Sequence, residues 1–250
     1  MLRTRNWEVS REDVLESETP ESTETHKLIP HGYFVEESEK IMEEENLTLK
    51  ETKYYMSVNG MMYFGKYIFD KKIYKENKGT IERKKDEHNP NVTLGFVNSH
   101  DKSLASCVFF GTRMPICSNE GWHNRMWFKR KHTGNIMDDL NVGIKSCLIN
   151  IDEFSEGYAD VMEGYKNSYL DDSDVRSLLV ESARKKVIPS SKILSVYKEW
   201  MNPSFSYDNN SDNVYKLYNA FTTVLRDYKE HAVTNPKRNF TLLELLSEVT

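Results

Sequence analysis

Apolar side chains recur at two different spacings in this chain of 250 residues, and the spacing changes near Gly134. Between Tyr54 and Phe128 apolar and polar residues alternate, which is typical of strands with one buried face. After Gly134 the apolar residues recur every three or four positions, as along one side of a helix. Antiparallel strands followed by helices predict an α+β fold, with a sheet of hairpins and then a C-terminal bundle of about five helices.

The first hairpin is predicted at residues 54–69. Two alternating runs flank Asn59-Gly60, a pair that readily takes the two positive φ angles of a type I′ turn. A second pair of β-rich runs flanks residues 98–103, where Asn, Ser and Asp side chains can hydrogen-bond their own backbone in a turn. The further strands are predicted at 92–97, 104–110, 114–117 and 127–128.

Apolar stripes predict the helices of the second half. The clearest stripe runs from Phe154 to Tyr169, with Asp152 as its expected N-cap. Pro189 and Pro203 end the next two helices, because proline lacks the N–H that a helix interior needs. The predicted helices cover residues 154–169, 173–188, 193–201, 214–228 and 241–249.

Charge is distributed unevenly along the chain. Residues 1–52 hold 14 acidic and 6 basic residues, a net charge of −8, whereas the whole chain carries −5. The remaining residues therefore carry +3, so the acidic total does not exclude a nucleic-acid partner. The sequence predicts three parts: an acidic, weakly ordered leader at 1–52, a β-rich domain at 53–134 and a helical region at 135–250 that packs on the sheet.

Composition excludes several classes of protein. Aromatic residues make up 12% of the chain, too many for a disordered polymer. No run of about 18 apolar residues is present to span a bilayer, and the N-terminal segment lacks the apolar core of a secretory signal. The three cysteines, Cys107, Cys117 and Cys147, are widely spaced, as expected for reduced thiols. These features predict a soluble, cytoplasmic protein.

The segment Trp122–His132, with the sequence WHNRMWFKRKH, is the strongest candidate for a binding site. Cations neutralise phosphates, and flat rings stack on unpaired bases with about 1–3 kcal/mol each. This interleaving predicts a surface for single-stranded nucleic acid; the alternative is an amphipathic strand that buries its rings and exposes its lysines. Residues 71–85 form a second basic region, which is either a further binding surface or only a solvated hairpin. The candidate binding residues are Arg125, Lys129, Arg130, Lys131, Trp122, Trp127 and Phe128.

Histidine, carboxylate and thiol side chains also gather between residues 100 and 132. If His100, Asp101, Cys117, His123 and His132 converge, they can bind zinc or another transition metal. None of them has a recognised ligand spacing, however, and the alternative is that Asp101 builds a turn while Cys117 fills the core. The chain also lacks Gly-x-Ser-x-Gly and glycine-rich phosphate loops. The sequence therefore favours a non-enzymatic protein and assigns no catalytic residue, metal or cofactor.

Four motifs, in order along the chain, resemble a known family. They are FVNSHDKS at 96–103, ICSN at 116–119, KHTGN at 131–135 and VYKLYNAFT at 214–222. Over residues 54–250 the chain is similar to the phage- and plasmid-borne family named domain of unknown function 932. Two places depart from the family pattern: Lys102, where glycine is usual, and Val214-Tyr215, where a tryptophan is often found.

The resemblance implies a biological context and a set of residues to test. The context is a bacteriophage or plasmid, near replication or recombination genes, in the cytoplasm of a bacterial host. The resemblance does not imply whether the motif residues bind, catalyse or shape turns. The residues to test are Asn98, His100, Asp101, Cys117, Asn119, His132 and Asn219.

Three functions remain open. The first is a non-enzymatic phage accessory protein that binds single-stranded nucleic acid as an annealing or mediator protein. The second is an anti-defence protein whose acidic residues 1–52 imitate the charge of DNA and inhibit a host protein. The third is a metal-dependent hydrolase that acts on nucleic acid or nucleotides through His100, Asp101 and His132. Self-association is compatible with all three, and no membrane partner is expected.

Overall fold

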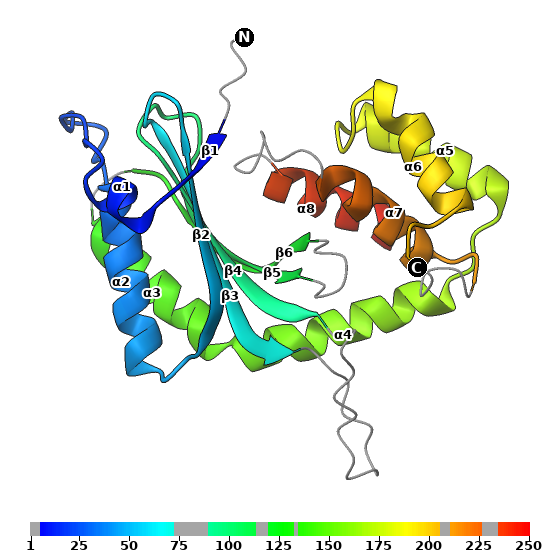
Figure 1. The fold of residues 1–250 in the computed structure, drawn as a ribbon, viewed down its shortest axis with the longest axis horizontal. Coiled ribbons are helices and arrows are strands. Elements are labelled where there is room, and N and C mark those ends of the chain that lie inside the picture. Colours follow the sequence, from blue (N-terminus) through cyan, green and yellow to red (C-terminus); the bar gives the residue numbers. More distant parts are fainter. Residues whose placement is uncertain (1–5, 73–89, 114–119, 133–134, 206–210, 227–234) are drawn as a thin grey trace.

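The computed structural model describes residues 6–72, 90–113, 120–132, 135–205, 211–226 and 235–250. Within these ranges it describes all side chains except those of residues 6, 71–72, 120, 123–127 and 235–236. The fold is α+β, as predicted: one antiparallel sheet comes first, and most helices follow it (Figure 1).

Six strands form one sheet. They are β1 (Asn6–Val9), β2 (Leu49–Ser57), β3 (Met62–Lys72), β4 (Asn91–Ser99), β5 (Ser106–Arg113) and β6 (Glu120–Arg130). Each strand pairs antiparallel with the next along the chain, so β1 and β6 form the edges of the described sheet. A strand that is covered on both faces carries buried residues at successive positions, and all nine residues of β4 are buried.

Helices cover both faces of this sheet. They are α1 (Arg11–Leu15), α2 (His31–Glu44), α3 (Ile136–Ile149), α4 (Ile151–Asn167), α5 (Asp172–Arg184), the 3₁₀ helix η1 (Ser190–Lys192), α6 (Ile193–Met201), α7 (Val214–Arg226) and α8 (Asn235–Ser247). Phe34 of α2, Ile144 of α3 and Phe154 of α4 belong to the larger core on one face. On the other face, Phe240 of α8 lies edge-on against Phe109 of β5, with ring centroids 5.6 Å apart. The described residues after 135 form six α-helices, one more than predicted.

Two glycines make room for large rings on the second face of the sheet. At Gly95 and at Gly111, a Cβ atom would overlap the rings of Phe109 and Trp122, respectively. These two rings meet edge to face, with centroids 5.2 Å apart. Glycine usually weakens a strand, so a glycine inside a strand often marks a place where another group lies close to the backbone. The rings can lie flat against the sheet because these positions carry no side chain.

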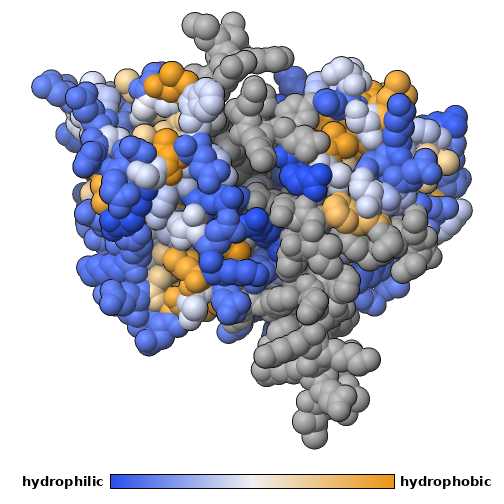
Figure 2. Space-filling model, in the orientation of Figure 1, coloured by the Kyte–Doolittle hydropathy of each residue, from blue (hydrophilic) through white to orange (hydrophobic). Residues whose placement is uncertain are grey.

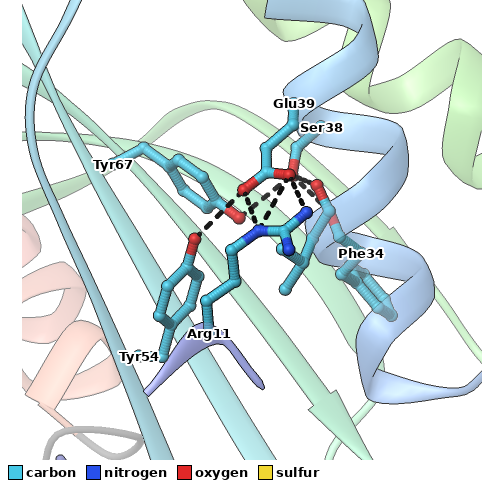
Figure 3. A network of polar contacts seen from close by, with 7 residues as sticks. Arg11, Phe34, Ser38, Glu39, Tyr54 and Tyr67 are labelled. Atoms are coloured by element: carbon cyan, nitrogen blue, oxygen red, sulfur yellow. Dashed lines mark hydrogen bonds and ion pairs between the residues drawn. The ribbon is translucent and has the colours of Figure 1, made fainter. Parts of the chain in front are cut away.

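Residues 6–52 belong to the folded molecule, contrary to the expectation of a weakly ordered leader. They form β1, α1, α2 and the start of β2, and Val14 is fully buried. Figure 3 shows how α1 is held: the Arg11 guanidinium pairs with Glu39 of α2 at 2.6 Å, and Tyr54 of β2 donates to the same carboxylate at 3.3 Å. Few apolar residues suffice here because α1 packs against α2, where Leu15 lies close to Gly32, and because Val14 and Phe34 join the larger core.

The first hairpin forms at the predicted place but with a different turn. Gly60 has a φ of 67°, whereas Asn59 is not among the described residues with positive φ. The Gly60 N–H donates to Ser57 O at 2.8 Å, and the Asn59 side chain accepts from the Met61 N–H at 3.2 Å. A type I′ turn needs positive φ at both central residues, so the type I′ prediction is wrong. The strand predicted at 114–117 lies outside the described residues.

The surface is mostly hydrophilic on the face shown in Figure 2, and its apolar side chains form small separate patches. Exposed large apolar residues include Trp7 of β1 and Val58 of the first hairpin. Single exposed apolar residues are ordinary on protein surfaces. No described helix combines the length and the apolar composition that crossing a bilayer requires.

Candidate functional site

Four histidines from four segments meet where β4 and β6 end and β5 begins. His31 begins α2, His100 follows β4, His132 follows β6, and His26 lies before α2. The rings of His31 and His100 are parallel, with centroids 3.9 Å apart. The rings of His26 and His132 lie 4.8 Å apart. We call these four residues the histidine cluster.

Asn98, near the end of β4, joins the two histidine pairs. Its Nδ2 donates to Ile29 O at 2.8 Å and to His31 Nδ1 at 2.9 Å. Its Oδ1 accepts from Ser106 Oγ at 3.0 Å, and Ser106 Oγ lies 3.1 Å from His132 Nε2. Asn98 and Ser106 are both fully buried, so their polar atoms depend on these protein partners.

The histidine rings attach the segment before α2 to the strand ends. His100 Nε2 lies 2.8 Å from Ile29 O, and His132 Nδ1 lies 3.2 Å from Lys27 O. Because carbonyl oxygens only accept, the facing ring nitrogens carry the protons. The Lys27 N–H also donates to His132 O at 3.0 Å. The backbone of this segment is therefore bonded to residues that follow two different strands.

Burial makes His31, His100 and His132 poor bases. Desolvation lowers the pKa of His31 from 6.5 to about 3, and the neighbouring His100 is the next cause. Desolvation is also the main cause that lowers the pKa of His100 and of His132, although hydrogen bonds to Ile29 and Lys27 act in the opposite direction. An imidazolium inside the cluster would lose its hydration. These three rings are therefore neutral near pH 7.

The cluster does not have the geometry of a metal site or of a working nucleophile. The Asp101 carboxylate is used in the turn after β4, where it accepts from Ser99 Oγ at 2.6 Å and from the Ser103 N–H at 3.0 Å. In the part of the chain that the structure describes, no group of three or more His, Cys, Asp or Glu side chains is placed to hold a metal ion. Ser106 and His132 have a nucleophile–base distance, but Ser106 is 0% exposed and closed to a substrate. The cluster positions segments of the chain.

Of the aromatic candidates in the Trp122–His132 segment, the two whose side chains the structure describes, Trp122 and Phe128, are turned inward. Trp122 is 2% exposed and packs against Phe109, so the expectation that its ring stacks on a base is wrong. Phe128 is partly buried and packs against α3. Its neighbours Arg125 and Trp127 lie in β6, and their side chains are outside the described residues. For Trp122 the amphipathic-strand alternative is therefore correct. Side chains of β6 point alternately to the two faces of the sheet, and Trp122 points into the smaller core on the face that carries Phe109.

The cations at the end of β6 remain exposed. Lys129, Arg130 and Lys131 have exposed side chains, and we call these three residues the basic strand end. The Arg130 guanidinium pairs with Asp139 in the first turn of α3, with 3.0 Å between Nε and Oδ2. Both side chains of this pair are more than a third exposed, so the ion pair is a weak, solvent-screened one. The basic strand end is accessible on an edge of the described sheet.

The seven motif residues do not form one site. Asn98, His100 and His132 meet in the histidine cluster, as the sequence suggested for the two histidines. Asn219 is buried in α7, which lies across the molecule from α2 (Figure 1). The motif residues outside the described part are Cys117 and Asn119, and the side chain of His123 is also outside it.

Sequence reasoning missed His26, His31 and Ser106. The two histidines lie in the stretch that was expected to be weakly ordered, and Ser106 stands outside any motif. The available signal was Pro30-His31, because a proline directly before an apolar stripe marks a helix start. Lys102 has a φ of 64°, the left-handed region that favours glycine. This is the position at which the family resemblance leads us to expect glycine.

Comparison with known proteins identifies a family. Residues 23–245 match the family model described as Domain of unknown function (DUF932). The matched range begins before α2 and ends in α8, so it includes His26 and His31 as well as the motif residues beyond residue 54. No curated protein and no solved structure matches the chain.

Proposed function

We propose that this chain, which belongs to the DUF932 family, binds single-stranded nucleic acid through the basic strand end. The observation that carries the proposal is the exposure of three consecutive cations, Lys129 to Lys131, at the end of the edge strand β6. Cations held together on a rigid element neutralise neighbouring phosphates and release their counterions. The role that fits is a non-enzymatic accessory protein in the replication or recombination of a phage or plasmid.

Neighbouring segments add charge and rigidity to the same end of the sheet. Lys27 and Lys102 both have exposed side chains. Lys27 is bonded to His132 through its backbone, with 3.0 Å between its N–H and His132 O. Lys102 lies in the turn that follows His100. The histidine cluster therefore supports a site in which five cations come from three segments.

Phosphate contacts, rather than stacking on Trp122, supply the proposed affinity. Contacts to the phosphate backbone carry little sequence information, so weak sequence preference and strong salt dependence are expected. Successive residues of a strand point to opposite faces, so Lys129 and Arg130 project to the two sides of the edge strand. The backbone of a single strand is flexible enough to contact both sides, whereas a duplex is stiff. Single strands are therefore the preferred substrate in this proposal.

The test measures binding of a fluorescently labelled single-stranded oligonucleotide by fluorescence anisotropy at several salt concentrations. The variant Lys129→Ala/Arg130→Ala/Lys131→Ala removes the basic strand end. We expect roughly tenfold weaker binding and a salt slope that is smaller by about 2, because each phosphate contact on a single strand contributes about 0.7. A duplex of the same sequence measures the preference for single strands.

A charge-matched variant provides the control. Lys40→Ala/Lys198→Ala/Lys237→Ala also removes three exposed cations, on α2, α6 and α8, and should leave the affinity nearly unchanged. Equal loss in both triple variants would mean that net charge alone decides binding. Unchanged affinity in the Lys129–Lys131 variant would refute the proposal.

Inhibition of a host protein is the second candidate, and the exposed carboxylates of α2 favour it. Glu36 and Glu43 have exposed side chains on this helix, and rows of carboxylates can imitate the charge of DNA. Deleting residues 1–52 is unsuitable as a test, because they contribute Val14 and other residues to the core. The variant Glu36→Gln/Glu43→Gln tests this function instead: capture of one host protein that this variant no longer captures would support it.

The proposed role places the protein in a bacterial cytosol, where thiols stay reduced. Cys107 and Cys147 are free. Burial raises the pKa of Cys107 to about 11 and that of Cys147 to about 12. Thiols with such pKa values react slowly, because the thiolate is the nucleophilic form.

A further inference from the structure

A groove of about 710 Å³ lies between α4 and α8, away from the histidine cluster. Its apolar lining includes Phe154 and Tyr158 of α4 and Leu243 of α8. Tyr165 closes part of the floor, where its hydroxyl donates to Leu243 O at 3.4 Å. The volume falls in the range of about 300–1,000 Å³ that is typical of ligand-binding clefts.

The rim of this groove is strongly acidic. Glu153, Glu156 and Asp160 follow one side of α4 at intervals of three and four residues, so they lie on one face of the helix. Glu244 of α8 faces them from the other wall. All four side chains are exposed. The described residues that line the groove include no Lys, Arg or His, so its charge is complementary to that of a cationic ligand.

No contact within the described structure requires the two glycines in the same wall of the groove. Gly157 and Gly164 lie in the interior of α4, where glycine costs about 1 kcal/mol relative to alanine. A Cβ atom at either position would meet nothing within 4 Å, and neither glycine has a positive φ. Neither packing nor backbone conformation therefore requires glycine here. Glycine also serves where another molecule must approach the backbone closely.

We propose that this groove binds a basic amphipathic helix of a partner protein. Such a helix places its apolar side chains against the partly exposed Val161 and Leu243 and its lysines or arginines against the carboxylates of the rim. The recognition mode is that of an amphipathic helix in an apolar groove. This proposal uses no residue of the basic strand end and stands independently of nucleic-acid binding.

The spacing of the glycines suits a helix as the occupant. Gly157 and Gly164 are seven residues apart, which is about two turns or 10.5 Å along α4. Packed helices usually lie 8–10 Å apart, depending on the side chains at the contact. Two missing side chains on one line allow the closer approach over two turns. A small cation such as a polyamine would be attracted by the rim but would leave the apolar floor uncovered.

The probe is a fluorescein-labelled synthetic helix built of leucine and lysine in heptad order. We expect it to bind the full chain, whereas the matching leucine–glutamate helix should not bind. The variant Gly157→Leu/Gly164→Leu fills the groove and should weaken binding at least about tenfold. Its fold is expected to survive, because a Cβ has open space at both positions, and circular dichroism checks this.

Charge variants keep the proposal testable if the leucine variant fails to fold. Glu153→Gln/Glu156→Gln should weaken binding of the leucine–lysine helix, and Glu36→Gln/Glu43→Gln, which removes two exposed carboxylates on α2, should not. Equal affinity of a folded Gly157→Leu/Gly164→Leu variant would overturn the proposal. So would equal binding of the leucine–glutamate helix, an equal effect of the two charge variants, or full displacement of the probe by spermidine at a comparable concentration.

Discussion

The rings of His31 and His100 lie parallel with their centroids 3.9 Å apart, although 69 positions separate the two residues in the sequence. His31 is the first residue of α2, and His100 directly follows β4. Two stacked imidazoles at this distance cannot both carry a proton at low cost, since like charges repel and burial removes their hydration. The contact therefore joins an early helix to the sheet and makes that junction sensitive to acid.

The first prediction concerns pH. The pKa of His31 is about 3 in the folded chain and near 6.5 in the unfolded chain, so below pH 6.5 the unfolded state binds more protons. The free energy of unfolding should then fall by about 2 kcal/mol from His31 alone between pH 7 and pH 5, and it should keep falling toward pH 3. Urea unfolding at a series of pH values measures this loss. His31→Gln should flatten the dependence; a flat profile in the wild type would contradict a buried, neutral His31.

The second prediction concerns Asn98. Asn98→Ala removes the donor to Ile29 O and His31 Nδ1 and the acceptor of Ser106 Oγ. Ile29 O keeps its contact with His100 Nε2, and Ser106 Oγ keeps its contact with His132 Nε2, but His31 Nδ1 stays buried without a hydrogen bond. We therefore expect a loss of about 1–3 kcal/mol in the free energy of unfolding. Asn202→Ala, at an exposed position after α6, should change it by less than about 0.5 kcal/mol. Similar losses in both variants would show that the Asn98 contacts contribute little.

The third prediction compares two glycines with opposite surroundings. Gly111→Ala places a Cβ in the space of the Trp122 ring and should destabilise the fold by about 1–3 kcal/mol through overpacking. Gly157→Ala meets no atom within 4 Å and should stabilise α4 by up to about 1 kcal/mol. Thermal unfolding of both variants distinguishes them. Shifts of the same sign would mean that one of the two environments is described incorrectly.

The fourth prediction tests whether residues 6–52 are part of the core. Val14 is fully buried against the larger core, so Val14→Ala should cost about 2 kcal/mol in the free energy of unfolding. Val58→Ala is the matched control, because Val58 is 71% exposed, and its effect should stay within about 0.5 kcal/mol. A weakly ordered leader would instead make Val14→Ala as harmless as the control.

The local spacing of apolar residues was sufficient to predict most strands and helices from residue 54 onward. The alternation at residues 54–69 and the stripe at Phe154–Tyr169 predicted a hairpin and a helix that the structure confirms. The helix predicted from residue 173 begins one residue earlier, at Asp172, with Asp171 as its N-cap. Such signals are local, because period and capping depend on neighbours within a few positions.

The candidate sites depend on contacts that no local pattern encodes. Residues 1–52 were predicted to be a weakly ordered leader, yet Val14 and His31 are buried, because α1 packs against α2 and His31 stacks on His100 after β4. The binding hypothesis treated Trp122 as exposed, but the space left by Gly111 takes its ring into the smaller core.

The amino-acid sequence by itself determined the fold class, the first hairpin and five of the six helices after residue 135, and the exposure of charged residues such as Lys129. Tertiary structure decided which distant residues meet: His31 with His100, Ser106 with His132, and the walls of the groove between α4 and α8. The physical reason is that periodicity records which side of an element is apolar, whereas the partner of that side is chosen only when the whole chain packs.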